Sequence, residues 1–573
     1  MKNRLILIGL MLTLILLLSC VNKSGKVENL YTFAKVYGYV RWFYPGDEAA
    51  SIDWDKFAVY GVRRIEKARN TNEVTETLLE LFLPIVPTIQ FIKKDQDLSF
   101  DTQPLIPSDT VGFKAIAWKH SGVYLSESNK FYKSERIILS EEMPKVGEVI
   151  NKNIGNDLKH IMPLVLYKNN AQTFPASDPK LLFDLKENLT DVSLNTSDPN
   201  DVSIRLANVI IAWNVIQHFY PYFDVVKIDW GNELTSTIQN TLLAKSEIEY
   251  FDVLRLFIAK LKDGHATVSK KLIGFGLPIK YDLIENNIVV TSSQSDEFQK
   301  GDIIKTIDGK SGLEELEYQK SFVSGSLRYK RYMALISFGI DFNGNEADLS
   351  IIRNGKEIII KTQRHSFSEM SIDPFATESF KIIDCGDGIV YLKGEPIDIN
   401  SNINILVNAK SMIISSRTDD SQQKLISHFI KEPVSGPRCY VPVFTYPDRE
   451  KMYFNHEGSM TIYPEKPFIK AKLVFLTYPD NISHEETYLD FIDHYKLAKL
   501  VGDTTAGCNG SRNTIPLIGG YSISFTGMKV LKRDSSQLYL IGYRPDYPVN
   551  RTINAIIENR DEYLEKALEI LKK

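Results

Sequence analysis

The sequence predicts a multidomain protein that combines α+β and α/β parts, and three observations lead to this fold class. At 573 residues the chain is longer than one hydrophobic core supports, while its 43% hydrophobic and 24% charged residues are typical of globular domains. An aromatic helical motif occurs twice in the first half. Residues 367–573 alternate apolar strands with helical stretches, which indicates a sheet covered by helices.

The repeated motif predicts two helical hairpins of one design. "WFYPGDEAASIDW" at 42–54 and "HFYPYFDVVKIDW" at 218–230 share Phe-Tyr-Pro and, six residues later, Ile-Asp-Trp. Proline ends the preceding helix, and an aspartate before tryptophan is suited to cap the next one. We therefore expect hairpins near 30–95 and 203–262. The alternatives are a chance likeness and a sugar-stacking use of the aromatic rings, but their helical spacing favours a core.

Residues 1–20, "MKNRLILIGLMLTLILLLSC", resemble the signal peptide of a bacterial lipoprotein. A basic start precedes an apolar run from Leu5 to Leu18, which is short for a membrane-spanning helix. The ending Leu-Leu-Ser-Cys is similar to a lipobox and predicts lipidation of Cys20. An ordinary cleaved signal is the alternative. A lipidated Cys20 would anchor the protein to a membrane in the bacterial cell envelope, at the outer membrane or facing the periplasm.

Charge and metal-ligand patterns argue against two other classes of function. The net charge is −4 with lysine and arginine scattered along the chain, so the sequence does not predict a nucleic-acid surface. The four cysteines lie far apart, without zinc-binding spacing. His484, Glu485 and His494 also lack the H-E-x-x-H spacing of a metallopeptidase. We therefore expect neither a metal nor a cofactor.

Short strands follow the second helical motif. "GDIIKTIDGKS" contains a strand and an Asp-Gly turn, and "ADLSIIRNGKEIIIKTQ" is a hairpin with Asn354-Gly355 as its turn. The order of these elements resembles a PDZ domain, which binds extended peptides at a sheet edge; another small β domain is the alternative. The predicted segments are a signal peptide at 1–20, an N-terminal helical segment at 27–100, a β-rich segment with a linker at 101–200, a helical cap at 201–270, a PDZ-like domain at 271–366 and an α/β core at 367–573.

Two side chains stand out as candidates for nucleophilic chemistry. Ser483 follows the strand Leu473–Thr477 and begins an amphipathic helix, so its hydroxyl can be exposed beside helical N–H groups. The alternative is a capping box made by Ser483 and Glu486. His265, in "LKDGHATV" at 261–268, lies where a helical stretch gives way to a strand; by itself it is as well explained by a turn.

The motifs from 203 to 573 resemble, in their order, the tail-specific or C-terminal processing family of serine peptidases. "LKDGHATV", the PDZ-like module, "YPDNISHEETYLDF", "LVGDTTAG" and "IGYRPDYPV" follow one another as they do in that family. The resemblance implies a crotonase-like α/β peptidase core at 367–573. It also implies Ser483 as the nucleophile and Glu486 as its accompanying acid. The implied substrate is a polypeptide, including its C-terminal segment.

The residue after the Thr-x-Gly turn departs from the family pattern. Many members have a lysine base there, whereas Cys508 follows Gly507 in this chain. The tricorn-like branch instead uses a histidine at the end of its helical cap, where this chain has His265. The resemblance therefore implies His265 as the general base, since imidazole accepts protons near neutral pH. His484 is less well placed, because helical neighbours point about 100° apart.

Other supporting residues are less clear from the sequence. Family members usually have Asp-Leu-Arg before a glycine-rich turn that supplies an oxyanion N–H, but "IISSRTDDSQQ" keeps Arg417 and has no glycine. We expect Arg417, His484 and Gly507 to support the site. The acid that orients the histidine in tricorn would fall near Tyr539.

Glu486 and Asp534 therefore remain as candidates for that acid. Two functions are left open: a serine peptidase that acts through an acyl-enzyme, and a catalytically inactive peptide-binding relative on the cell envelope.

Overall fold

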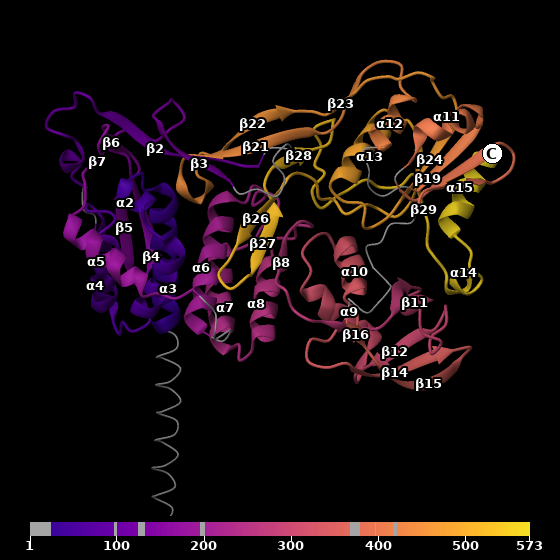
Figure 1. Ribbon diagram of the computed structural model, residues 1–573, viewed down its shortest axis with the longest axis horizontal. Coiled ribbons are helices and arrows are strands. Elements are labelled where there is room, and N and C mark those ends of the chain that lie inside the picture. Colours follow the sequence, from indigo (N-terminus) through magenta and orange to yellow (C-terminus); the bar gives the residue numbers. More distant parts are fainter. Residues whose placement is uncertain are drawn as a thin grey trace, which may run out of the picture.

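The computed structural model describes residues 25–96, 100–123, 132–194, 201–366, 379–395, 397–415 and 421–573. Figure 1 shows helices and sheets in several packed layers, with the N-terminal part at the left and the C-terminal α/β part at the upper right. The predicted multidomain fold with mixed helix and sheet is confirmed. In the ranges described, none of the helices has both the length and the apolar character needed to cross a bilayer.

The two copies of the repeated motif form equivalent sets of three helices, one more than the hairpin that the sequence predicts. The first set is the helix at 25–43 with α3 (Trp54–Ile65) and α4 (Thr71–Phe82). The second set is α6 (Val202–Phe219), α7 (Trp230–Leu243) and α8 (Glu247–Ala259). The second and third helices begin at 54 and 71 in one set and at 230 and 247 in the other, so the spacing is the same.

Equivalent hydrogen bonds occur within each of the two sets. The hydroxyl of Tyr37 donates to the Trp54 carbonyl at 3.2 Å, and Nε1 of Trp213 donates to the Trp230 carbonyl at 2.7 Å. The aspartate before each tryptophan accepts a hydrogen bond from a backbone N–H in the first turn of α3 or α7, as the sequence predicts for an N-cap. The repeat is therefore one of structure as well as of sequence.

Each helical set is joined to a three-stranded antiparallel sheet, and the set with its sheet is called the first unit for the first copy and the second unit for the second copy. In the first unit the strand order is β1 (Gln90–Lys93), β5 (Leu158–Pro163), β4 (Val149–Gly155). In the second unit it is β8 (Thr267–Ser269), β27 (Ser522–Thr526), β26 (Arg512–Pro516). Since β26 and β27 come from the C-terminal part of the chain, the second unit is assembled from two distant segments.

A seven-stranded sheet joins the two units at its centre. There β2 (Lys114–Ser121) pairs antiparallel with β21 (Arg438–Phe444), His120 opposite Phe444 and Ser121 opposite Val443. In the first unit, β2 also pairs with β3 (Lys133–Ile138) and β6 (Leu166–Lys168). In the second unit, β21 pairs in the same way with β22 (Tyr453–Gly458) and β28 (Lys529–Leu531). This reciprocal pairing relates the two units by an approximate twofold axis between β2 and β21. Figure 1 shows the shared sheet along the top.

The C-terminal core is a mostly parallel sheet of order β17-β18-β19-β24-β25-β29, in which the edge strand β17 (Lys381–Asp384) is antiparallel to β18. Its parallel strands are β18 (Ile389–Lys393), β19 (Ser411–Ser415), β24 (Lys472–Thr477), β25 (Lys499–Gly502) and β29 (Tyr547–Pro548). Apolar side chains of α13 (His484–His494) pack on one face of the sheet, and those of α15 (Glu562–Lys572) pack on the other. The predicted α/β arrangement brings Ser483 to the carboxyl end of β24.

A β module lies between the second helical set and the core. Its sheet has the order β10-β11-β12-β14-β15. The bounds are β10 (Ile279–Ile284), β11 (Asn287–Ser293), β12 (Ile303–Ile307), β14 (Glu346–Arg353), β15 (Lys356–Gln363), α9 (Gly312–Ser321) and α10 (Leu327–Ile336). Asn354 and Gly355 both have positive φ, as a two-residue hairpin turn requires. Helix α5 (Pro179–Thr190) lies where the sequence suggested β structure and a linker.

Candidate active site

Ser483 lies in a strained turn between strand and helix. Strand β24 ends at Thr477, α13 begins at His484, and Ser483 has φ 62° and ψ −118°. Its side chain makes no capping hydrogen bond, and its N–H donates to the Cys508 carbonyl at 2.8 Å. The capping-box interpretation therefore does not describe this serine. A strained, half-buried serine with an uncommitted hydroxyl at the start of a helix is typical of a nucleophile.

Glu486 holds the loop that lies against Ser483. Its buried carboxylate accepts hydrogen bonds from the N–H groups of Gly507 and Cys508, each at 2.7 Å, and from the Thr505 hydroxyl. Burial raises the pKa of Glu486 to about 7, although these three donors act in the opposite direction. Because the N–H of Gly507 donates to Glu486, this hydrogen bond fixes the loop. The same N–H is therefore already engaged and does not point to a substrate position.

His265 lies in the turn between α8 and β8. Its backbone N–H donates to Oδ1 of Asp263 at 2.9 Å, and Nδ1 of its ring lies 3.0 Å from Oγ1 of Thr526. The ring is half-buried, and Nε2 has no hydrogen-bond partner in the described part of the chain. Loss of surrounding water lowers the pKa of His265, the negative charge of Asp263 opposes this shift, and Arg512 adds to it.

Asp263 and Thr526 form a buried network behind the imidazole. Both residues are fully buried. Oδ1 of Asp263 accepts from the Thr526 hydroxyl at 2.7 Å, and Oδ2 accepts from the Thr526 N–H at 2.7 Å. The thiol of Cys508 donates to Oδ1 at 3.2 Å. The network thus links the cap turn, the end of β27 and the loop that Glu486 holds.

Cys508 and Gly264 bring the two turns that carry the candidate side chains into contact. A Cβ atom on Gly264 would lie 2.8 Å from Cδ1 of Ile482 and 3.0 Å from Cβ of Cys508. The cap turn before His265 therefore packs directly on the residue before Ser483. Cys508 contacts both sides, because its carbonyl accepts from Ser483 and its thiol donates to Asp263.

Asp263, His265 and Cys508 offer ligand atoms within 4.8 Å of one another, which could suggest a metal site. The Thr526 hydroxyl lies among them, 2.7 Å from the carboxylate, 3.0 Å from Nδ1 and 3.6 Å from the sulfur. Burial also raises the pKa of the Cys508 thiol well above its usual range, which disfavours the thiolate that binds metals. Hydrogen bonding accounts for this cluster.

Other residues singled out from the sequence lie apart from this network or outside the described ranges. His484 is exposed and stacks on the Tyr488 ring at 4.8 Å. Asp534 accepts from the Ser536 N–H in a surface turn. Tyr539 is buried with its hydroxyl 2.5 Å from that of Tyr220. Arg417 and Cys20 fall in segments that the structure does not describe.

Sequence reasoning missed Asp263 and Thr526. Asp263 stands two residues before His265 in the same motif, so its partner role could have been considered. Thr526 is 263 positions from Asp263, and no local pattern connects the two.

The first unit lacks this constellation. By helix spacing and strand pairing, the positions equivalent to Asp263, His265 and Thr526 are Pro87, Ile89 and Met162. All three are apolar, so none can accept or relay a proton. The candidate Asp263–His265–Thr526 constellation of the second unit therefore has no counterpart at the equivalent positions of the first unit.

The β module also contacts the loop near Ser483. At the start of α10, the Ser326 hydroxyl donates to the Ala506 carbonyl at 2.7 Å, and Nε of Arg328 donates to the Thr505 carbonyl at 2.7 Å. The module is thereby fixed to the loop that Glu486 also holds.

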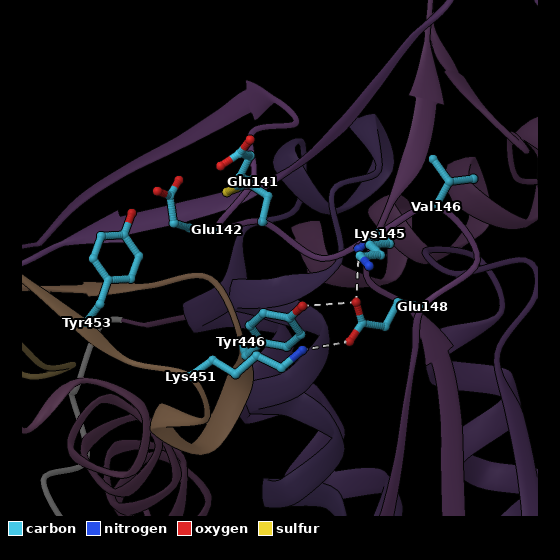
Figure 2. Close-up of a pocket in the computed structure, with 9 residues that line it drawn as sticks. Glu141, Glu142, Lys145, Val146, Glu148, Tyr446, Lys451 and Tyr453 are labelled. Atoms are coloured by element: carbon cyan, nitrogen blue, oxygen red, sulfur yellow. Dashed lines mark hydrogen bonds and ion pairs between the residues drawn. The ribbon is translucent and has the colours of Figure 1, made fainter.

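A hollow of about 600 Å³ lies elsewhere, between residues 141–148 of the first unit and the segment that follows β21. Figure 2 shows Tyr446 and Lys451 directed toward Glu148, with Glu141 and Glu142 on another part of the rim. Glu148 accepts from the Tyr446 hydroxyl at 2.9 Å and from Lys451 at 3.1 Å. None of the candidate catalytic residues lines this hollow.

Comparison with known proteins agrees with the family resemblance. Residues 401–549 match the model of peptidase family S41, and no curated protein matches the chain. The structure of mature CPAF complexed with lactacystin has 14% identity and a TM-score of 0.53 over 65% of this chain and 98% of its own. A second crystal structure of mature CPAF gives the same identity and TM-score, with 97% of its own chain covered.

At this identity the likeness to CPAF shows a shared fold. The photosystem II D1 C-terminal processing protease is matched with 12% identity over 66% of this chain and 98% of its own, at a TM-score of only 0.35. The family match itself is limited to residues 401–549, in the C-terminal part of the chain, which match the peptidase domain of family S41.

Proposed function

We propose that this protein is a serine peptidase that hydrolyses peptide bonds in extended polypeptide segments, with Ser483 as nucleophile and His265 as general base. One observation carries the proposal. The strained turn of Ser483 and the cap turn of His265 meet at Cys508, and both the serine hydroxyl and the imidazole Nε2 are uncommitted in the described part of the chain.

The chemistry follows from these two groups. The hydroxyl proton of Ser483 moves to Nε2 of His265 while Oγ bonds to the carbonyl carbon of the substrate and the C=O electron pair moves to oxygen. When the carbonyl reforms, the C–N bond breaks and the amine leaves with the proton from His265. A water molecule then gives a proton to Nε2 of His265 while its oxygen bonds to the acyl carbon. The bond between that carbon and Oγ breaks, His265 returns the proton to Oγ, and the acid product leaves a restored Ser483.

Helix α13 supports charge development in this reaction. The helix begins at the residue after Ser483, so the positive end of its dipole lies next to that serine, which supports a role in stabilising an oxyanion. The N–H of Ser483 is already bonded to Cys508, and Glu486 fixes that loop. We propose Glu486 and Gly507 as residues that hold the site in shape, and His484 and Arg417 as flanking support.

A catalytically inactive peptide-binding relative is the second candidate. Two features favour it: Cys508 replaces the lysine of many relatives, and the segment after Arg417 has no glycine to form the oxyanion turn. We propose that the module at 271–366 supplies peptide binding in either case, and its hydrogen bond to the Ala506 carbonyl, in the loop that contacts Ser483, supports this role.

A fluorophosphonate probe separates the two functions. We expect wild-type protein to be labelled, Ser483→Ala to lose labelling, and Ser321→Ala, which changes an exposed serine, to keep it. Absence of wild-type labelling together with retained peptide binding would favour the inactive relative. Cleavage of matched peptides with free and amidated C-termini would show whether the substrate is recognised by its terminal carboxylate.

We further propose that Cys20 is lipidated and anchors the protein in the bacterial cell envelope. The proposal rests on the basic start, the apolar run and the Leu-Leu-Ser-Cys ending of residues 1–20. Mass spectrometry of the N-terminal peptide should show an acylated Cys20, and Cys20→Ser should release the protein from membranes. An unmodified N-terminus after a different cleavage position would refute lipidation.

A further inference from the structure

We infer that Thr526 and Asp263 are positioning residues that hold the proton of His265 on Nδ1 and leave the lone pair of Nε2 directed to Ser483. The inference rests on the proposed peptidase function and supplies the orienting group that the sequence left open. In this arrangement the Asp263 carboxylate contacts the imidazole ring through the Thr526 hydroxyl and not directly.

The direction of each hydrogen bond follows from Asp263. Its Oδ1 accepts from the His265 N–H at 2.9 Å, and its Oδ2 accepts from the Thr526 N–H at 2.7 Å. Backbone N–H groups can only donate, so both carboxylate oxygens act as acceptors. Asp263 is fully buried, and these contacts supply the hydrogen bonds that a buried carboxylate needs.

The Thr526 hydroxyl therefore has one arrangement. It lies 2.7 Å from Oδ1 of Asp263, an acceptor, and gives its single proton there. Toward Nδ1 of His265, at 3.0 Å, it can then only accept. A neutral imidazole that donates from Nδ1 has its lone pair on Nε2, so the network assigns the tautomer that a general base for Ser483 requires.

The same network stabilises the imidazolium formed during catalysis. Asp263 is the negative group facing the ring and opposes both burial and the positive charge of Arg512 on β26, which lower the pKa of His265. Cys508, on the loop against α13, also faces the network but is held as a neutral thiol. Positive charge on the ring is therefore balanced through the Thr526 hydroxyl by a carboxylate that is already in place.

The acids suggested by the sequence do not serve this role. Glu486 is bonded to Thr505, Gly507 and Cys508. Asp534 lies in a surface turn.

A pair of substitutions at Thr526 tests the inference. Thr526→Val keeps the shape and the methyl group but removes the hydroxyl, whereas Thr526→Ser keeps the hydroxyl. We expect Thr526→Val to lower kcat about ten- to a thousandfold with little change in KM, because orientation of the base rather than substrate binding is lost. Thr526→Ser should stay within about threefold of wild type. Equal activity of the two variants would overturn the inference.

A second measurement does not depend on activity. ¹⁵N-histidine NMR of the full chain, with the His265 signals assigned by His265→Gln, reports the tautomer. We expect the Nδ1–H form in wild type, Ser483→Ala and Thr526→Ser, and a mixture of tautomers in Thr526→Val. An Nε2–H form in wild type would refute the positioning role even if Ser483 is labelled. Failure of labelling with the Nδ1–H form present would instead refute only the peptidase function.

Discussion

The hydroxyl of Thr526 donates to the Asp263 carboxylate at 2.7 Å, although the two residues are 263 positions apart in the chain. Thr526 ends strand β27, and Asp263 lies in the turn after α8. Because β27 pairs with β8, the strand that follows this turn, the pairing places the hydroxyl beside both the carboxylate and the imidazole. The candidate base is thus held by contacts between two segments of the second unit that are far apart in the sequence.

Replacement of Gly264 by alanine should damage the site by moving the cap turn away from the serine turn. The new Cβ would lie 2.8 Å from Cδ1 of Ile482, the mobile end of that side chain, and 3.0 Å from Cβ of Cys508, which can give way only if its backbone shifts. We expect stability to fall by about 1–3 kcal/mol and turnover to fall by at least tenfold. Steady-state kinetics and thermal unfolding measure the two effects. Gly344→Ala, where the added atom meets nothing within 4 Å, is the control; equal behaviour of both variants would contradict the packing account.

Replacement of His265 by alanine should lower peptide-ester turnover by several orders of magnitude, because one member of a cooperating nucleophile–base pair is removed. In wild type, kcat should rise with pH as the imidazole loses its proton. Burial lowers the pKa of His265, so the midpoint should lie below the ordinary value of 6.5. A pH–rate profile checks this. Near-normal turnover in His265→Ala with complete loss in Ser483→Ala would show that another base serves the serine.

Low pH should lower the free energy of unfolding, because three buried histidines near the contact between the two units resist protonation in the folded protein. Burial lowers the pKa of His120 to about 4 and that of His160 and His218 to about 3. Below pH 6.5 the unfolded chain binds protons that the folded chain does not, so stability falls as pH falls from 6.5 toward 4. Each histidine contributes up to about 3 kcal/mol of this loss. Urea unfolding at pH 7.5 and 5 measures it.

The variant His160→Phe isolates the contribution of one of these histidines to the pH dependence of stability. The His160 ring stacks on Tyr39, and neither of its nitrogens has a partner in the described part of the chain. Phenylalanine keeps the stacking and removes two buried polar atoms. We expect higher stability, by about 1–3 kcal/mol, and a weaker dependence on pH. An unchanged pH dependence would show that His160 is not buried as a neutral ring in solution.

Cys508 should be chemically silent although it lies in the centre of the site. Its side chain is buried, and burial raises the pKa of its thiol well above the usual range, so little thiolate is present. We expect iodoacetamide to modify Cys385, which is partly exposed, much faster than Cys508 in the folded protein. Peptide mass spectrometry compares the two sites.

Cys508→Ala should keep turnover within a few-fold, since the backbone bonds to Ser483 and Glu486 remain. Rapid alkylation of Cys508, or a large loss of turnover in the alanine variant, would assign it a chemical role.

The repeat could be predicted from the sequence because helix ends are specified by residues that are close together in the chain. Proline after an apolar run and aspartate before tryptophan specify where one helix ends and the next begins, and both features occur in each copy. The third helix of each set begins with a different cap, Asn70 in one copy and Ser246 in the other. Each cap is followed three residues later by a glutamate, Glu73 or Glu249, so this start signal is shared, but it lies outside the identical Phe-Tyr-Pro and Ile-Asp-Trp segments on which the prediction of a hairpin rested.

The sequence by itself determined the fold class, the family resemblance and the identity of Ser483 and His265 as candidates, because each depends on residues close together in the chain. The tertiary structure alone decided that β2 pairs with β21 and that β26 and β27 complete the second unit. It also decided that Thr526 reaches Asp263 and that Glu486 holds a loop instead of capping a helix. These contacts join segments hundreds of residues apart, and strand partners and buried hydrogen bonds at that range are chosen by packing of the whole chain rather than by local preference.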